Sequence, residues 1–252
     1  MKNMGIADNI TKMIALSKYS TKKIFFKKRI IISILILLLV TVIMGYAGSQ
    51  NTNTLTTGAG LLESLILTFF MPAVCMIYGC SMITDEIEDK SISHVLTSPM
   101  ERISAYIAYY ISLVICLCVI IIAITTSGFL SFFVQQGFTE EAMTIYYTML
   151  GLVIFGVFVY SSLFLFTSVI FKRPIYFGLF YAFIWEGFIG NIPGRIQKIS
   201  ISHYLRSIGS DQVKYFSVSD AAGVNLSIVT LIIVIIILIL FGSIIFKTKE
   251  FP

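Results

Sequence analysis

Long apolar runs alternate with short polar stretches along this chain. A helix needs roughly 20 apolar residues to cross a hydrocarbon core of about 30 Å, and six segments meet or approach that length. They are 30–47, 61–84, 104–133, 143–171, 174–190 and 224–246. Because lipid forces the backbone to satisfy its hydrogen bonds internally, each run is expected to be helical. The pattern therefore predicts an all-α polytopic membrane protein with six transmembrane helices, of which the fifth is the shortest.

Composition agrees with this class and excludes others. Of the 252 residues, 57% are hydrophobic and only 12% are charged, whereas a soluble domain carries about 25% charged residues. The mean hydropathy is +0.93. Too few polar side chains are present to cover a water-facing surface. This excludes a cytosolic enzyme and a nucleic-acid binder whose basic face meets solvent.

The distribution of basic residues predicts the orientation. If the N-terminus lies inside, all but four of the 18 Lys and Arg residues fall on cytoplasmic segments. The four on the outside are Arg195, Lys198, Arg206 and Lys214. Since cytoplasmic flanks carry an excess of Lys and Arg, both termini are expected to face the cytoplasm, in a multi-pass protein of the cell membrane.

The first 29 residues form a separate, basic arm ahead of the six-helix domain, 30–252. Its apolar residues Ile6, Ile10, Met13 and Ile14 share one helical face, and lysines occupy the other. This spacing predicts an amphipathic helix in the membrane interface, with its lysines directed to anionic headgroups of membrane lipids. The alternative is a basic flank that only sets the topology.

The cytoplasmic loop between the second and third spans is unusually acidic. Asp85, Glu86, Glu88 and Asp89 fall within five positions, on the side where Lys and Arg predominate. Beyond them, Ile92, Val95 and Leu96 can line one face of a short helix that Pro99 ends. Such a helix is suited to docking in a groove on a soluble partner. The alternative is a solvated charged loop.

The order Glu86, Ser91, Leu96, Pro99 and Arg102 resembles a pattern of ABC-2 type transporter permeases. In that family the segment follows the second transmembrane helix, and it is similar to the coupling helix that contacts a separate ATPase subunit. The Gly-Thr usual in the family is Lys90-Ser91 here, and the acidic residue usual in the basic run before the first span is missing. The resemblance implies an exporter subunit that pairs with a second permease subunit, as a homodimer or a heterodimer. It also implies an ATPase-coupling site formed by Glu86, Glu88, Ser91, Leu96, Pro99 and Arg102.

Nucleotide chemistry is expected to lie on another polypeptide. The chain has no GxxxxGK[ST] phosphate-binding loop, so ATP and Mg²⁺ would be bound by the partner ATPase. No enzyme activity, cofactor, metal site or nucleic-acid partner is expected for this chain itself. The alternative function is a stand-alone secondary transporter or an immunity-type membrane protein.

Glu186 and Arg195 mark a possible path or gate at the outer side. The region 191–223 is long for a connection, and it resembles the extracellular re-entrant gate region of ABC-2 permeases. Glu186, at the outer end of the fifth span, either lines a path for substrate or pairs structurally with Arg195 or Lys198. Glu63, at the outer end of the second span, is interpreted as interfacial.

Overall fold

The computed structural model describes residues 6–50, 54–89, 101–135, 137–188, 196–213, 215–216 and 221–249, without the side chains of 6–8, 26 and 54. All regular elements within these ranges are helices. In chain order they are α1 (Ile6–Phe26), α2 (Ile30–Ser49), α3 (Thr54–Leu62), the π-helix η1 (Glu63–Phe70), α4 (Met71–Glu88), α6 (Arg102–Phe133), α7 (Glu140–Ile170), α8 (Pro174–Leu179), the π-helix η2 (Phe180–Glu186), the 3-10 helix η4 (Gln197–Ile199), α9 (Ile201–Gln212) and α10 (Val224–Thr248). The predicted all-α class is confirmed for this part of the chain.

Five helices among the described residues are long and apolar enough to cross a membrane. They are α2, the continuous helix Leu55–Glu88, α6, α7 and α10. Each corresponds to one of the predicted segments, although the second begins several residues earlier than predicted. The structure is therefore that of a membrane-embedded helical protein.

The predicted span 174–190 is not confirmed. Its place is taken by the six-residue α8 and the seven-residue η2. At an α-helical rise of 1.5 Å per residue these elements extend about 20 Å, which is shorter than the hydrocarbon core. Pro174 lies at the start of α8, and the buried carboxylate of Glu186 lies at the end of η2. Among the described residues, five of the six predicted spans meet the length criterion, and the sixth stays a prediction.

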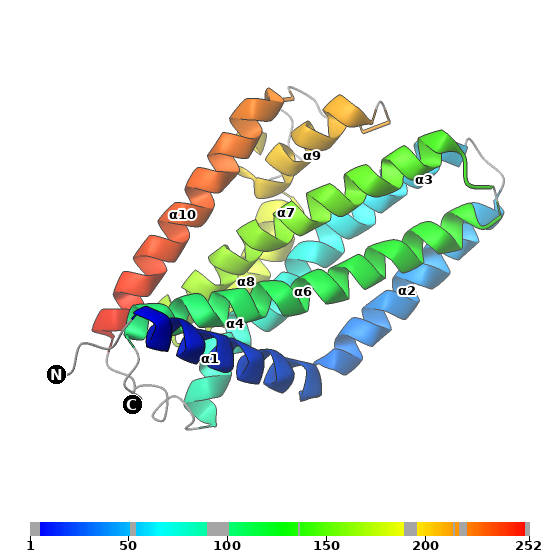
Figure 1. Cartoon of the computed structure of the whole chain (residues 1–252). Coiled ribbons are helices and arrows are strands. Elements are labelled where there is room, and N and C mark those ends of the chain that lie inside the picture. Colours follow the sequence, from blue (N-terminus) through cyan, green and yellow to red (C-terminus); the bar gives the residue numbers. More distant parts are fainter. Residues whose placement is uncertain are drawn as a thin grey trace.

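Helix α6 lies at the centre of the bundle, where it packs against α1, α2, α7 and α10 (Figure 1). Glycines permit the closest approaches. A Cβ atom on Gly48 would lie 2.7 Å from the backbone oxygen of Phe132, and one on Gly79 would lie 2.6 Å from Cβ of Phe164. Helices in lipid associate mainly through such close packing, because the surrounding acyl chains are as apolar as the side chains.

Hydrogen bonds between helices add to this packing. The hydroxyls of Ser33 and Tyr78 are 2.7 Å apart and join α2 to α4. Ser131 of α6 donates to the backbone oxygen of Thr41 in α2, also at 2.7 Å. These bonds satisfy hydroxyl groups that would otherwise be unpaired among apolar side chains.

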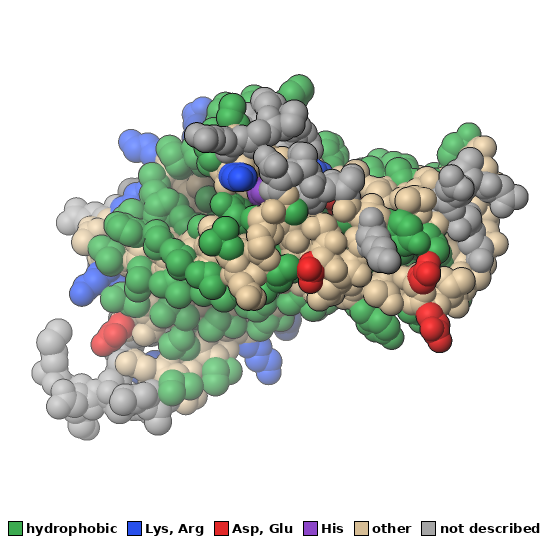
Figure 2. Space-filling model, turned by 90° about the horizontal axis from the view of Figure 1, so that it is seen from above, with side chains coloured by type: hydrophobic (Ala, Val, Ile, Leu, Met, Phe, Trp, Pro, Cys, Tyr) green, Lys and Arg blue, Asp and Glu red, His purple; other side chains and the backbone are tan. Residues whose placement is uncertain are grey.

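The outside of the bundle is apolar. Figure 2 shows hydrophobic side chains over a broad area of one face, with Lys and Arg toward its margins. Only 17% of the most apolar stretch of α2, and the same share of α10, is buried, against 61% for the other three long helices. The two peripheral helices therefore present most of their Ile and Leu side chains outward, as expected for contact with lipid.

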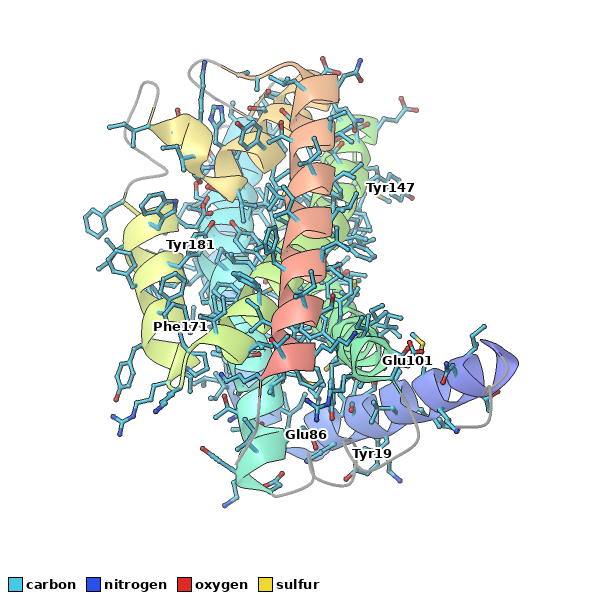
Figure 3. The ribbon with its side chains drawn as sticks, turned by 90° about the vertical axis from the view of Figure 1, so that its left-hand side faces the viewer. Tyr19, Glu86, Glu101, Tyr147, Phe171 and Tyr181 are labelled. Atoms are coloured by element: carbon cyan, nitrogen blue, oxygen red, sulfur yellow. The ribbon has the colours of Figure 1, made fainter. Side chains whose placement is uncertain are left out.

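The molecule has two distinct ends. At the basal end α4 and α10 finish and α6 begins, and α1 runs across the base of α6 and extends to one side of the bundle (Figures 1 and 3). At the distal end α6 finishes, α7 begins and α9 covers the bundle (Figure 1). The helix predicted within 1–29 corresponds to α1, while its position in a membrane interface stays a prediction.

Candidate functional site

The last turn of α4, at the basal end, carries carboxylates in two environments. Asp85 and Glu86 are buried, with exposed fractions of 8% and 3%, whereas Glu88 and Asp89 are exposed. Moving an ionised carboxylate out of water costs several kcal/mol unless a cation and hydrogen bonds compensate it. Asp85 and Glu86 therefore require basic partners.

Those partners come from the end of α1 and the turn into α2. The Nζ atom of Lys23 lies 2.9 Å from Oε1 of Glu86 and 3.0 Å from Oδ2 of Asp89. Arg29 holds Asp85 through both guanidinium Nη atoms, with Nη2 at 2.8 Å from Oδ1. Bidentate contact of this kind fixes orientation as well as charge.

Lys27 completes the network. Its Nζ atom lies 3.1 Å from Oδ2 of Asp85 and 3.2 Å from Oδ2 of Asp89. We call this network the α1–α4 clasp; its members are Lys23, Lys27, Arg29, Asp85, Glu86 and Asp89. Figure 3 shows Glu86 at the level where α4 meets α1. The clasp joins two segments that lie about 60 positions apart in the sequence, at the basal end of the bundle.

The clasp favours the charged forms of Lys23 and Asp89. Partial burial opposes the charge on Lys23, but hydrogen bonds to Glu86 and Asp89 outweigh it and raise the pKa of the Lys23 amine. Hydrogen bonds from Lys23 and Lys27 lower the pKa of the Asp89 carboxyl. Lys23 and Asp89 are therefore both ionised at neutral pH.

The two predicted coupling residues in α4 differ in accessibility. Glu86 is enclosed by its ion pair with Lys23 and presents little surface to a partner. Glu88 is exposed, and no ion pair among the described residues includes it. Of the two, Glu88 is the one whose side chain is exposed.

Arg102, another predicted coupling residue, begins α6 at the same end of the bundle. Its Nη1 atom donates to the backbone oxygen of Lys247 at 3.0 Å, and so joins α6 to the last turn of α10. Arg102 and Glu86 are thus at the same end but have different partners. Three predicted coupling residues lie outside the described residues: Ser91, Leu96 and Pro99.

Glu186, predicted to be in a path or gate, is fully buried at the end of η2. Its Oε1 accepts hydrogen bonds from the hydroxyl of Tyr181 at 2.9 Å and the backbone N–H of Ile201 at 3.0 Å. Its Oε2 accepts from Oγ of Ser200 at 2.5 Å and the backbone N–H of Ser202 at 3.3 Å. The carboxylate therefore binds the first amides of α9.

This arrangement makes Glu186 a cap for α9 supplied from another element. The first N–H groups of a helix lack internal partners and carry a partial positive charge, so a carboxylate is favourable there. Of the two cations considered from the sequence, Lys198 is exposed and Arg195 lies outside the described residues. The geometry supports a structural role for Glu186 through hydroxyl and amide donors. Ser200, directly before an apolar helical pattern, is the sequence signal that could have indicated this helix start.

A second polar contact at the distal end was not predicted. Nε of Arg206, in α9, lies 3.2 Å from Oε1 of Glu63, and its guanidinium also donates to Oγ1 of Thr68. Both charged side chains are largely buried. Glu63 is thus paired across the bundle and not simply interfacial. The two partners lie more than 100 positions apart in the sequence, so no local pattern indicates that they pair.

Two adjoining cavities lie among distal segments. One of 260 Å³ lies between α7, α9 and α10, and one of 200 Å³ lies between the start of α7 and the residues after α9. They share Gln212, whose side-chain oxygen accepts a hydrogen bond from Thr148 at 3.2 Å. Each is smaller than the roughly 300–1,000 Å³ of a typical ligand pocket.

Neither a metal site nor similarity to a known protein indicates what these residues do. Within the described ranges, no group of three or more His, Cys, Asp or Glu side chains could hold a metal ion. No family model and no curated protein matches the chain. The geometry of the clasp and the order of residues after α4 are therefore the remaining indications of function.

Proposed function

We propose that this chain is the membrane-spanning permease subunit of an ABC transporter of the ABC-2 type. It would export a substrate across the cell membrane with ATP hydrolysed by a separate ATPase subunit, which holds the ATP and Mg²⁺. One observation carries the proposal: the α1–α4 clasp lies immediately before segment 90–100, which holds most of the coupling motif. The clasp provides a way for a partner that binds this segment to act on the helices of the membrane domain.

The clasp suggests how such coupling would work. Glu86 is fixed to Lys23, and α1 packs along α6, the central helix of the bundle. A displacement of the segment after α4 would therefore reach α6 both through α4 and through α1. In this proposal Glu88 contacts the ATPase, while Glu86 and Arg102 position the segment between α4 and α6.

The charge distribution supports the orientation that this function requires. Most described Lys and Arg residues lie at the basal end, including the clasp, Arg102 and the end of α10. By the positive-inside rule that end would face the cytoplasm, with both termini. The apolar outer faces of α2 and α10 leave room for membrane lipids and for a second permease subunit, as a homodimer or a heterodimer.

Co-purification tests the proposal directly. The tagged chain is purified in mild detergent from its source membranes, and the retained ATPase is measured by mass spectrometry and ATP hydrolysis. We expect Glu88→Lys to reduce the retained ATPase at least tenfold, because it places a cation at the contact surface. Glu140→Lys, an equal charge change on an exposed residue at the distal end, is the matched control.

The outcomes separate the proposed function from its alternative. Retention of an ATPase by the wild-type chain, with loss only in Glu88→Lys, supports the permease. Absence of any ATPase, together with ion-gradient-driven uptake by the chain alone in vesicles, would identify a stand-alone secondary transporter. If an ATPase is retained, the same complex can be tested for ATPase stimulation across lipids, glycans, peptides, drugs and ions.

A further inference from the structure

An open groove runs between α1 and the adjacent part of α6, on the side of α1 away from the clasp. It has a volume of 830 Å³, within the range of about 300–1,000 Å³ typical of sites that hold small molecules. Figure 3 shows α1, which carries Tyr19, extending sideways from the base of the bundle. Six of the ten residues that line the groove are apolar: Ile10, Met13, Ile14 and Phe25 come from α1, and Ile111 and Ile115 come from α6.

Contacts between α1 and α6 hold the groove in place. The hydroxyl of Thr21 lies 3.1 Å from that of Ser112 and also donates to the backbone oxygen of Ser17. These polar groups are paired with each other. Among the apolar wall residues, Ile14 and Ile115 are exposed by 63% and 48%. The groove therefore offers apolar surface that the described part of the chain does not cover.

Two lysines line the groove together with these apolar residues. Lys18 and Lys22 are one helical turn apart, so they share a face of α1. Both are exposed, and no ion pair among the described residues includes either of them. The clasp lysines, Lys23 and Lys27, are by contrast neutralised by carboxylates. The groove thus combines a long apolar trough with two positive charges at one edge.

We propose that this groove binds one anionic phospholipid, with an acyl chain along Ile14 and Ile115 and the phosphate at Lys18 and Lys22. Aliphatic walls suit a hydrocarbon chain, and two lysines suit a headgroup with net negative charge. A zwitterionic headgroup would bring its own cation to these lysines and gain less. The inference does not depend on the transport function, because it uses only the geometry of α1 and α6.

Fluorescence quenching by brominated lipid tests this site. The single tryptophan, Trp185, is replaced by Phe, and Phe25→Trp places a reporter in the groove. The protein is reconstituted in phosphatidylcholine vesicles with 20% of either brominated phosphatidylglycerol or brominated phosphatidylcholine. We expect phosphatidylglycerol to bind the site at least about fivefold more strongly, since each lysine near an anionic surface contributes about that factor.

Matched variants assign the preference to the groove. Lys18→Gln with Lys22→Gln should bring the ratio of the two binding constants close to one. Lys28→Gln with Lys172→Gln, which removes two exposed charges outside the groove, should leave the ratio unchanged. A Val119→Trp reporter, one turn beyond Ile115 on α6 and also exposed, should show no preference. If Phe25→Trp does not fold, Ile111→Trp serves on the opposite wall.

Three results would overturn the proposal. Equal quenching by the two brominated lipids would show that the site does not select an anionic headgroup. A preference that survives loss of Lys18 and Lys22 would place the selectivity elsewhere. Weak quenching by both lipids would show that a protein segment or a second copy covers the groove.

Discussion

The two ends of the bundle manage their charges in different ways. At the basal end three cations and three carboxylates form one network, and several of these side chains remain partly exposed. At the distal end two carboxylates, Glu63 and Glu186, are buried, and each has its own set of donors: Arg206 for Glu63, and four hydroxyl or amide groups for Glu186. The basal carboxylates share the cations Lys23 and Lys27, whereas the two buried distal carboxylates share no donor.

This difference predicts where the fold tolerates change. Exposed ion pairs contribute little individually, because water and salt compete for the same charges. Removing one partner of a buried polar contact leaves an uncompensated group, which costs several kcal/mol. The buried distal contacts should therefore contribute more to stability than the exposed ion pairs that Asp89 makes in the clasp.

The largest effect is expected at Glu186. Glu186→Leu removes the acceptor for the amides of Ile201 and Ser202 and should lower the free energy of unfolding by about 4–5 kcal/mol. Glu186→Gln, which keeps one acceptor oxygen, should lower it by less than half as much. Thermal unfolding in detergent can be followed with a thiol-reactive dye, since three of the free cysteines are buried. A stable Glu186→Leu protein would show that α9 does not depend on this cap.

A smaller but still large effect is expected for the ion pair between α9 and η1. Arg206→Leu leaves the Glu63 carboxylate buried without its cation and should cost about 3 kcal/mol. The double variant Glu63→Leu with Arg206→Leu removes both charges and should recover part of this loss. A double-mutant cycle measures the coupling between the two side chains. Additive losses would contradict a direct interaction.

The smallest effect is expected at Asp89 in the clasp. Its side chain is 46% exposed, so Asp89→Asn should cost less than about 1 kcal/mol and less still at high salt. Because the folded pKa of Asp89 is lowered, its contribution is present above the unfolded pKa of about 4 and is lost as pH falls through the folded pKa. The melting-temperature difference between wild type and Asp89→Asn should therefore shrink between pH 5 and pH 3. A constant difference would exclude charge pairing as its cause.

The sequence predicted the parts of the fold that depend on continuous patterns. α2, α6, α7 and α10 follow from apolar runs of sufficient length, and α1 follows from its periodic apolar face. In the described part of the run 174–190, regular helix ends at Glu186, whose carboxylate accepts hydrogen bonds from the start of α9. Contacts between distant residues were not predictable: nothing local to Glu63 indicates Arg206, and nothing local to Glu86 indicates Lys23. The acidic cluster itself was visible, but its internal partners were not.

The close contact between α2 and α6 has a consequence for the order of events during synthesis. α2 is long and apolar enough to cross a membrane. The backbone oxygen of Thr41, however, can accept its hydrogen bond only after Ser131, 90 residues later in the chain, has been synthesised. Gly48 likewise can pack against α6 only after Phe132 has been synthesised. α2 is thus synthesised well before the residues of α6 that it packs against. During that interval α2 can contact only the described elements that precede α6 in the chain, such as α4 through the hydrogen bond between Ser33 and Tyr78.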